Sequence, residues 1–472
     1  MTPPPRKHTL AVRGFAVLTG LACVGLFALS GRSEPPAELP SPRAIPAGPA
    51  GLTLSASAAI RWALEHNPQL ATFRKQRGIA EAAVIVSRQY PFNPIFQHFV
   101  WYGNGPANAG VTNHVFNEHT GRLDLEINHQ GKYRRGTARE ALTRTEWEIA
   151  AQELLISIQT ARAFNNLLYR RDKYRLMEET MRFTEETSEY ITKLVDQGVL
   201  RSSDLLLARA DVAEARTQLG PGRGLMVVAE NDLRRTLGLV GEQFNVEGTL
   251  EKGFGTLDAS ALVQAALERR PDLRAFEFAV READNRLRFE IANRWGNPSL
   301  GPAFEYNETS VFFVGSWLIW SPPVINQRRG EIRQREAEKA RAVQAVHQSE
   351  VQVRQDVYTA LARLEQAERV TNSFRTETLP QLRQTRKGFD QLFAQGQPGV
   401  DLASLIAIRR RILRLRDAYL DALFELSQAQ TDLAAAVADL SFVGCGVAVP
   451  EQQASTPSAG SQSPERANDS GD

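Results

Sequence analysis

LSASAAIRWALEHNPQLATF (Leu54–Phe73) recurs later in the chain as LDASALVQAALERRPDLRAF (Leu257–Phe276). The two stretches align without gaps, and about half of their positions are identical. The shared frame includes Ala63-Leu64-Glu65 and, at fixed spacing after it, a proline, a leucine and a phenylalanine. One short match can arise by chance, so the features that follow it decide whether the chain is duplicated. A duplicated chain would contain two copies of one unit that pack beside each other.

The same order of features does follow in both halves. Each half continues with an Asn-Pro that opens an aromatic segment, and then with a basic glycine motif that opens a very long helical stretch. A Gln-Gly closes that stretch, and an Asp-Leu opens a return helix. In the first half these features are Asn93-Pro94, Gly131–Gly136, Gln197-Gly198 and Asp204-Leu205, and in the second half they are Asn297-Pro298, Asn326–Gly330, Gln395-Gly396 and Asp401-Leu402.

Composition excludes several classes of protein. The chain has 472 residues, 42% of them apolar and 23% charged, and its net charge is +2, so no strong field favours nucleic acid or an anionic membrane surface. Two cysteines, Cys23 and Cys445, cannot form a disulfide framework or a cysteine-rich metal cluster. Only residues 15–30 approach the length of a transmembrane helix, which excludes a polytopic helical membrane protein. A β-barrel stays compatible, because its strands carry no long apolar runs.

Both ends of the chain read as segments outside the fold. Residues 1–30 contain basic residues followed by an apolar run and small residues, which is typical of a cleaved signal peptide. An uncleaved membrane anchor and a lipidated Cys23 are the alternatives. Residues 31–51 are rich in Pro and Ala and read as a linker, and residues 446–472 read as a disordered tail. The two repeats are then expected at 52–250 and 251–445.

Each repeat is expected to begin with one helix and continue with two short strands. Ser55 or Ser57 can cap the first helix, which runs to about Gln89, and Asp258 caps its counterpart, which runs to about Asn293. The first pair of strands is expected at Phe96–Tyr102 and, from strict alternation, at Leu123–Asn128; the second pair is expected around Phe304–Tyr306 and at Val311–Trp320, joined by a tight turn at Asn307–Thr309.

The helices that follow are too long for an ordinary domain. Residues 137–196 contain no proline and would extend about 90 Å as a helix. Residues 330–394 are similar, with a kink expected at Pro380. The glycine-rich Gly220–Gly224 predicts a break or loop in the first return helix, with a bent helix as the alternative. In the last helix, coiled-coil spacing links Leu405, Ile412, Tyr419, Leu423, Leu426, Leu433, Val437 and Leu440.

Aromatic residues gather in the predicted strands. Trp101, Tyr102, Trp317 and Trp320 fit the aromatic girdle of a barrel at a membrane interface. The alternative is a soluble β-hairpin whose aromatic side chains form a core.

Helix, two strands and a long helical hairpin, given twice, resemble the TolC-like outer-membrane factors of Gram-negative tripartite efflux systems. The resemblance covers about residues 52–440. Within that family, NHQGKYRR (Asn128–Arg135) and PPVINQRRGEI (Pro322–Ile332) resemble motifs of the cobalt–zinc–cadmium efflux branch. The implied fold is mostly α with short β: a homotrimer in which each chain adds four strands to a twelve-stranded outer-membrane barrel continuous with a periplasmic α-helical barrel. Four strands cannot close a barrel alone, and lipid does not tolerate open sheet edges.

The resemblance implies a passive exit duct and no enzyme. Substrate, with heavy-metal cations as one class, would come from an inner-membrane RND-type pump and a periplasmic adaptor, a membrane fusion protein, and would cross the outer membrane. No cofactor and no nucleic-acid partner is expected, and the sequence has no catalytic motif. A type I secretion duct of the same fold and a periplasmic coiled-coil adaptor or scaffold are the alternatives.

The hairpin turns would form the periplasmic tip. The residues that resemble the adaptor-docking surface are Gly198, Val199, Leu200, Ser202, Asp204, Gly396 and Val400. Asp401 and Ser404 stand at the places of the pore constriction, where some members have two aspartates. We hypothesise that Asp401 pairs with Arg409, Arg410 or Arg411 to hold the tip closed. The alternative is that Asp204 and Asp401 are N-caps of the return helices.

Histidines are concentrated in the first strand pair and its loop, as His98, His114, His119 and His129. Their spacing differs from the i, i+4 helical spacing of a zinc motif, so no metal site is predicted. A weak metal contact near the outer mouth and a polar loop with incidental histidines are the two interpretations.

Overall fold

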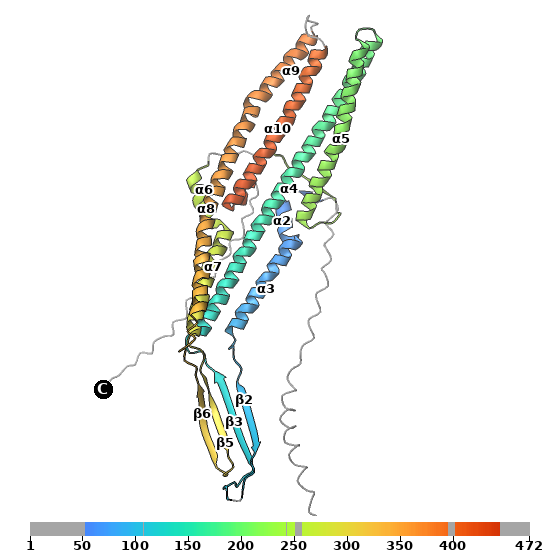
Figure 1. Cartoon of the computed structure of the whole chain (residues 1–472). Coiled ribbons are helices and arrows are strands. Elements are labelled where there is room, and N and C mark those ends of the chain that lie inside the picture. The colour runs from blue at the N-terminus through green and yellow to red at the C-terminus, as the bar shows by residue number, and fades with distance from the viewer. Residues whose placement is uncertain (1–51, 107, 242, 251–256, 395–401, 444–472) are drawn as a thin grey trace, which may run out of the picture. The chain divides into compact units, whose positions relative to one another are not determined.

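The computed structural model describes residues 52–106, 108–241, 243–250, 257–394 and 402–443. In these ranges the chain is mostly helical, with one four-stranded and one two-stranded sheet (Figure 1). The predicted signal peptide, linker and tail lie outside the described residues, and so do both cysteines. The repeat boundaries at 52–250 and 251–445 stay a prediction.

The predicted order of elements is confirmed in both halves. A helical segment, two strands and a long helical hairpin follow one another twice. The first half contains β1 (Leu52–Leu54), α2 (Ala56–His66), α3 (Pro68–Arg88), β2 (Ile95–Tyr102), β3 (Val115–Asp124), α4 (Gln130–Asp196) and α5 (Ser202–Leu237). After β4 (Phe244–Val246), the second half contains α6 (Ala259–Arg269), α7 (Pro271–Asn293), β5 (Ser299–Tyr306), β6 (Phe312–Ile319), α8 (Arg329–Ser373), a π-helical turn (Phe374–Thr378), α9 (Leu379–Ala394), α10 (Leu402–Val437) and a short 3-10 turn (Leu440–Val443).

Each half begins with two helices, so the prediction of one helix was wrong. Pro68 and Pro271 are the first residues of α3 and α7. A proline disfavours the helical conformation at the residue before it, but it suits the first turn of a helix. Asn67 is accordingly extended, and its side-chain Oδ1 accepts a hydrogen bond from the Leu70 amide at 3.0 Å.

Two of the predicted caps are confirmed. Ser55 Oγ accepts a hydrogen bond from the amide of Ala58 at 3.3 Å and so caps α2. Asp258 caps α6 in the same way, because its Oδ1 accepts from the Ser260 amide at 3.1 Å. Each cap satisfies one of the free amides at a helix start.

The predicted break at Gly220–Gly224 was wrong. Helix α5 continues through this segment with Pro221 inside it. A Cβ atom on Gly222 would lie 2.6 Å from Sδ of Met177, on α4. The glycine therefore permits close packing of α5 on α4 where a loop was predicted.

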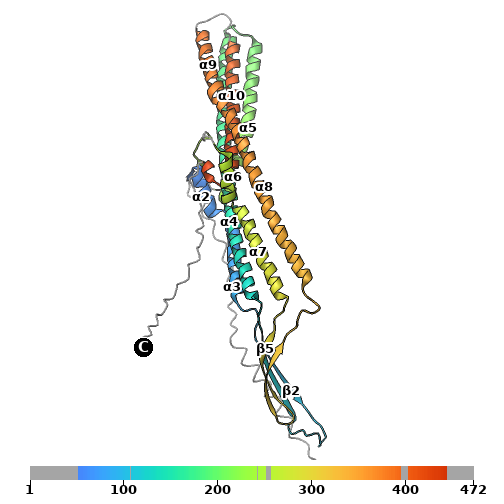
Figure 2. The ribbon, with the colours of Figure 1, turned by 90° about the vertical axis from the view of Figure 1, so that its left-hand side faces the viewer.

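The long helices are confirmed. Helix α4 runs for 67 residues, and α8 runs for 45 residues before the π-helical turn. This turn ends one residue before Leu379-Pro380, so the predicted kink at Pro380 coincides with a change in helix geometry. In Figure 2 the turn between α4 and α5 lies at the opposite end of the molecule from the strands, and so do the last residues of α9 and the first residues of α10.

Strands β2, β3, β5 and β6 form one antiparallel sheet in that order. Three strand predictions are confirmed, but the one at Leu123–Asn128 was wrong, because β3 spans Val115–Asp124. The backbone amides of the residues after β3 find other partners: Leu125 donates to Pro298 O at 2.8 Å, and Glu126 donates to Tyr90 Oη at 3.2 Å. Because these amides bond outside the strand ladder, β3 ends at Asp124, and the chain leaves the sheet before α4 begins at Gln130.

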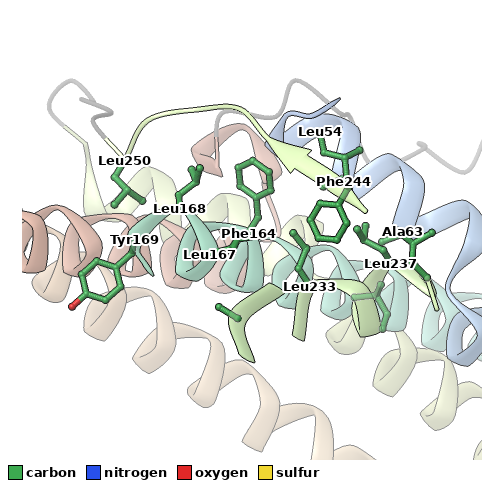
Figure 3. Packing of buried hydrophobic residues seen from close by; sticks show 14 of the residues in the cluster. Leu54, Ala63, Phe164, Leu167, Leu168, Tyr169, Leu233, Leu237, Phe244 and Leu250 are labelled. Atoms are coloured by element: carbon green, nitrogen blue, oxygen red, sulfur yellow. The ribbon is translucent and has the colours of Figure 1, made fainter. Parts of the chain in front are cut away.

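Helix α10 packs against the helices of both halves. Phe164, Leu168, Leu233 and Leu237, from α4 and α5, pack with Phe244 and other residues of β1 and β4 in one buried cluster (Figure 3). The small parallel sheet formed by β1 and β4 was not predicted. Leu423 of α10 belongs to this cluster, whereas Leu426 and Leu433 belong to a second cluster with α6 and α8. The coiled-coil seam predicted for the last helix thus joins the two halves.

Candidate functional site

The four-stranded sheet has one charged and one uncharged face. Side chains alternate along a strand, and directly paired residues share a face. The register pairs Glu118 with Glu305 and puts Arg122 and Asp124 on the same face, which we call the charged face. These four are the Asp, Glu, Lys and Arg residues of the four strands, so the opposite, uncharged face carries none of them.

The uncharged face exposes large apolar side chains. Phe96 on β2 is 79% exposed, and Leu318 on β6 is 69% exposed. Strands β2 and β6 end the sheet on its two sides, so each has one edge that pairs with no other described strand. Within the described part of the chain, both the uncharged face and the two outer edges of this sheet therefore lack a partner.

The four girdle residues do not share a face. The pairing of Trp101 with Phe116 places it on the charged face, as does the pairing of Trp317 with Gly301, whereas Tyr102 lies on the uncharged face. Trp320 follows β6, and its indole Nε1 donates a hydrogen bond to the carbonyl of Trp295 at 3.0 Å. Sequence position alone grouped these residues, because a face is defined only by the strand register.

Two of the four strand-region histidines meet across neighbouring strands. His98 and His119 are directly paired, their rings stack at 4.2 Å, and their Nδ1 atoms lie 3.0 Å apart. His114 Nδ1 lies 3.0 Å from the carbonyl of Gly103, and His129 sits at the start of α4 with a φ of 62°. Among the described residues no group of three or more His, Cys, Asp or Glu side chains could hold a metal ion.

The turn of the first hairpin is described in full. Gly198 has a φ of 75°, and its amide donates to Val195 O at 2.9 Å, while Val199 is 66% exposed. Asp204 is the third residue of α5 and not its N-cap: its Oδ2 accepts from the amide of Arg201 at 3.2 Å. It still satisfies a free amide of the first turn, although from a different position than predicted.

The second turn lies mostly outside the described residues. Gly396, Val400 and Asp401 fall there, and Ser404 is described only as part of the backbone of α10. The predicted docking residues of this turn, the constriction and any ion pair of Asp401 stay predictions.

Ion pairs connect α10 to the first hairpin near the hairpin ends. Arg410, one of the arginines of the gating hypothesis, pairs with Asp211 on α5. Arg416 pairs with Glu179 on α4 at 2.5 Å. The guanidinium of Arg409 lies 5.6 Å from the centre of the Phe183 ring. A hollow of about 400 Å³ beside Arg410 is lined by Thr187, Ile191, Leu207, Asp211 and Ile406.

A second polar link joins α4 to α10 nearer the middle of these helices. Lys173 Nζ donates to Asp421 Oδ1 at 2.7 Å, and Tyr169 Oη donates to the same oxygen at 2.6 Å. Burial would lower the pKa of Lys173, but hydrogen bonds to Asp421 and Tyr169 outweigh it and raise that pKa above its usual range. The lysine and the aspartate therefore stay charged at neutral pH.

Sequence reasoning missed these connections. The two members of the Arg410–Asp211 pair are 199 positions apart, and those of the Lys173–Asp421 pair are 248 positions apart. The available signal was the arginine run in the last helix, which showed that a charge lay there but not what it would pair with.

No helix of the described residues is both long enough and apolar enough to cross a membrane.

Solved outer-membrane channels have a similar fold. No protein-family model matches the sequence, and neither does any curated protein. CusC, described as forming a transmembrane channel, matches with a TM-score of 0.65 at 18% identity, over 81% of this chain and 91% of that chain. The outer membrane protein VceC of Vibrio cholerae matches with a TM-score of 0.62 at 14% identity, over 83% and 96%. The open MtrE outer membrane channel of Neisseria gonorrhoeae matches with a TM-score of 0.61 at 17% identity, over 81% and 89%. At these identities the similarity shows the fold alone, and it confirms the predicted TolC-like channel fold of the single chain.

Proposed function

We propose that this chain is one of three identical subunits of an outer-membrane exit duct. The observation that carries the proposal is the four-stranded sheet, which has two unpaired edges, all its strand charges on one face and exposed apolar side chains on the other. In a membrane barrel a polar face lines the lumen and an apolar face meets lipid. The sheet has the chemistry of a barrel wall.

Three copies of this sheet fit a closed twelve-stranded barrel. Strands β2, β3, β5 and β6 alternate in direction, so β6 of one copy can pair antiparallel with β2 of the next. Closure would remove every open edge, which lipid requires. The paired helices would then continue as a periplasmic tube, and the exposed apolar residues of the hairpin ends, such as Val199, would face an adaptor protein.

The duct would conduct passively, without catalysis. An inner-membrane RND-type pump and a periplasmic membrane fusion protein would deliver the substrate. Docking would involve Gly198, Val199, Leu200, Ser202, Asp204, Gly396 and Val400, and Asp401 and Ser404 would line the constriction. Metal cations are the cargo that the sequence motifs at Asn128–Arg135 and Pro322–Ile332 favour.

Planar-bilayer recording tests the proposal. Purified full-length protein should insert as a trimer and give discrete conductance steps. Failure to conduct, together with release of the protein from membranes by salt or alkaline washing, would favour the periplasmic adaptor or scaffold. For the cargo, a strain without this gene should become more sensitive to cobalt, zinc or cadmium; sensitivity to drugs alone, or loss of protein secretion, would exclude the metal assignment.

A further inference from the structure

The loop between β6 and α8 carries two apolar side chains that are exposed to solvent. Val324 is 74% exposed and Ile325 is 98% exposed. The loop (residues 320–328) lies at the end of the sheet that adjoins the helices (Figure 1). Within the described part of the chain these two side chains bury little apolar surface, so a partner would be needed to bury them.

Hydrogen bonds hold the loop in this conformation. The amide of Val324 donates to the carbonyl of Pro322 at 2.8 Å, and the amide of Arg328 donates to Asn326 Oδ1 at 3.0 Å. Gln327 Oε1 accepts from Nη2 of Arg294 at 2.8 Å and from Nη2 of Arg329 at 2.9 Å. Gln327 therefore ties the loop to Arg294, at the end of α7, and to Arg329, the first residue of α8.

Two tryptophans flank the same loop. The hydrogen bond from Trp320 to the carbonyl of Trp295 joins the two residues, and both side chains are about half exposed. Indole rings favour the membrane–water interface, where one part of the ring system is apolar and the N–H is solvated. A hollow of about 470 Å³ beside the loop is lined by Arg294, Arg328 and Glu331, among others.

Basic residues dominate this end of the sheet. The four segments that connect the sheet to the helices, taken together with the adjoining helix ends, span residues 88–94, 125–136, 290–298 and 320–333 and contain eight Lys and Arg residues and three Glu residues. At the other end of the sheet, residues 103–114 carry no Asp, Glu, Lys or Arg, and residues 307–311 carry one Glu. The positive charge exceeds the net +2 of the whole chain and is confined to one end of the sheet.

We propose that the loop (residues 320–328), with Trp295, Arg294 and Arg329 beside it, binds the phosphate headgroups of anionic phospholipids. Val324 and Ile325 insert among the acyl chains of the leaflet that faces the helices, while Arg294 and Arg329 contact the phosphates. The basic residues match the negative charge of the headgroups, and the apolar side chains match the acyl chains that lie below the headgroups. The inference rests on the proposed function, because it requires the sheet to span the bilayer.

Lipid retention tests it. Full-length protein is reconstituted in nanodiscs of phosphatidylethanolamine with one fifth phosphatidylglycerol, and the lipids retained after transfer to detergent are counted by native mass spectrometry. Wild type should retain phosphatidylglycerol in preference to phosphatidylethanolamine. Each of Arg294→Gln and Arg329→Gln should weaken that preference about fivefold, Ile325→Ser should lower retention of both lipids, and Arg329→Lys should keep the preference.

Arg354→Gln is the matched control, because it removes an exposed arginine from α8 away from the loop. Equal retention by wild type, Arg294→Gln and Arg329→Gln would overturn the inference, and so would an equal loss in Arg354→Gln. A crosslink from Ile325→Cys to a second copy of the chain would also overturn it, since the loop would then be a subunit contact. Conductance is recorded for every variant: normal conductance with no lipid preference refutes the lipid site alone, whereas a wild type that never conducts refutes the proposed function.

Discussion

Gly238 ends α5 in a left-handed conformation, with a φ of 72°. The backbone of α2 lies against it: a Cβ atom at this position would be 2.8 Å from the carbonyl oxygen of His66 and 2.9 Å from Cδ of Pro68. Gly224, earlier in the same helix, has no heavy atom within 4 Å of such a Cβ. Two glycines of one helix thus differ in whether packing requires them.

Gly238→Ala should destabilise the protein by about 1–3 kcal/mol, because a side chain there is strained and meets backbone. Gly224→Ala should be neutral or stabilising by up to about 1 kcal/mol, since alanine favours a helix. The thermal unfolding midpoint, measured by circular dichroism in detergent, compares the two variants. Equal midpoints for them would contradict this account of Gly238.

Asp421 links stability to pH. Burial would raise the pKa of Asp421, but hydrogen bonds from Lys173 and Tyr169 outweigh it and hold the pKa below its usual range. A carboxyl with a lowered folded-state pKa contributes stability above its unfolded pKa of about 3.9, and this contribution is lost as the pH falls through the folded value.

Asp421→Asn should therefore lower the unfolding midpoint at about pH 7, and the difference from wild type should shrink below about pH 4. Melting curves over a pH series measure this difference. Asp417→Asn is the control, because Asp417 lies farther from Lys173, at 3.4 Å, and should show a smaller effect. A difference that does not change with pH would show that the Asp421 contact acts through packing and not through charge.

At the scale of elements, the sheet and its junction with the helices hold the residues on which the proposed function depends. Both long helices that leave the sheet start after a residue in left-handed conformation that is not glycine, His129 before α4 and Arg328 before α8. The duplicated sequence thus repeats a backbone turn as well as a residue pattern. The strand register then separates charged from uncharged residues.

Val314→Arg and Phe313→Arg test the two faces at adjacent positions of β6. Val314 lies on the uncharged face, where an arginine should cost about 2–4 kcal/mol in lipid. Phe313 lies directly opposite Glu305 on the charged face, where an arginine gains a partner. The amount of detergent-extracted trimer in the outer membrane should fall several-fold for Val314→Arg and little for Phe313→Arg. If the yield fell more for Phe313→Arg than for Val314→Arg, the charged face would be the one that meets lipid, and the proposed assignment of the two faces would be wrong.

At the scale of the whole molecule, charges on α10 connect the two hairpins. The Arg410–Asp211 and Arg416–Glu179 pairs lie near the hairpin ends, and Lys173 pairs with Asp421 nearer the middle. If the chain forms the proposed trimeric duct, opening its tip by moving one hairpin against the other would break these pairs in each subunit. A gating role of Asp401, which lies outside the described residues, stays a prediction, and the Arg410–Asp211 pair adds a second one.

Arg410→Ala should raise the open population of the channel in planar bilayers by roughly threefold or more, because three partly exposed ion pairs are lost together. Asp211→Asn should have the same effect. Arg414→Ala removes an exposed arginine of α10 that has no part in the gating hypothesis, and it serves as the control. An unchanged closed state in both Arg410→Ala and Asp211→Asn would refute a gating role for this pair.

Net charge illustrates what a whole-chain average conceals. A charge of +2 predicted no attraction to an anionic membrane surface. The four stretches where the sheet meets the helices (residues 88–94, 125–136, 290–298 and 320–333) nevertheless hold eight basic and three acidic residues. The average conceals this because acidic residues elsewhere in the chain compensate. Only the connections between sheet and helices show that the four segments lie at one end of the sheet.

The sequence alone predicted the duplication, the order of elements, the long helices and the seam of α10, because these follow from local periodicity and from repeated motifs. It misplaced β3, missed the helix breaks at Pro68 and Pro271, and broke α5 at Gly220–Gly224. Local patterns cannot show that neighbouring helices need a glycine, or which hydrogen bonds end a strand.

The tertiary structure decided which residues share a face, which charges pair, and that α10 joins the two halves. These relations connect residues that are far apart in the sequence: Arg410 and Asp211 are 199 positions apart, and Lys173 and Asp421 are 248 positions apart. Register and helix packing arise from the combined burial of many side chains, so no single stretch of the sequence encodes them. The sequence therefore sufficed for the units of the fold, and the packing of those units set the charged face, the ion pairs and the exposed loop.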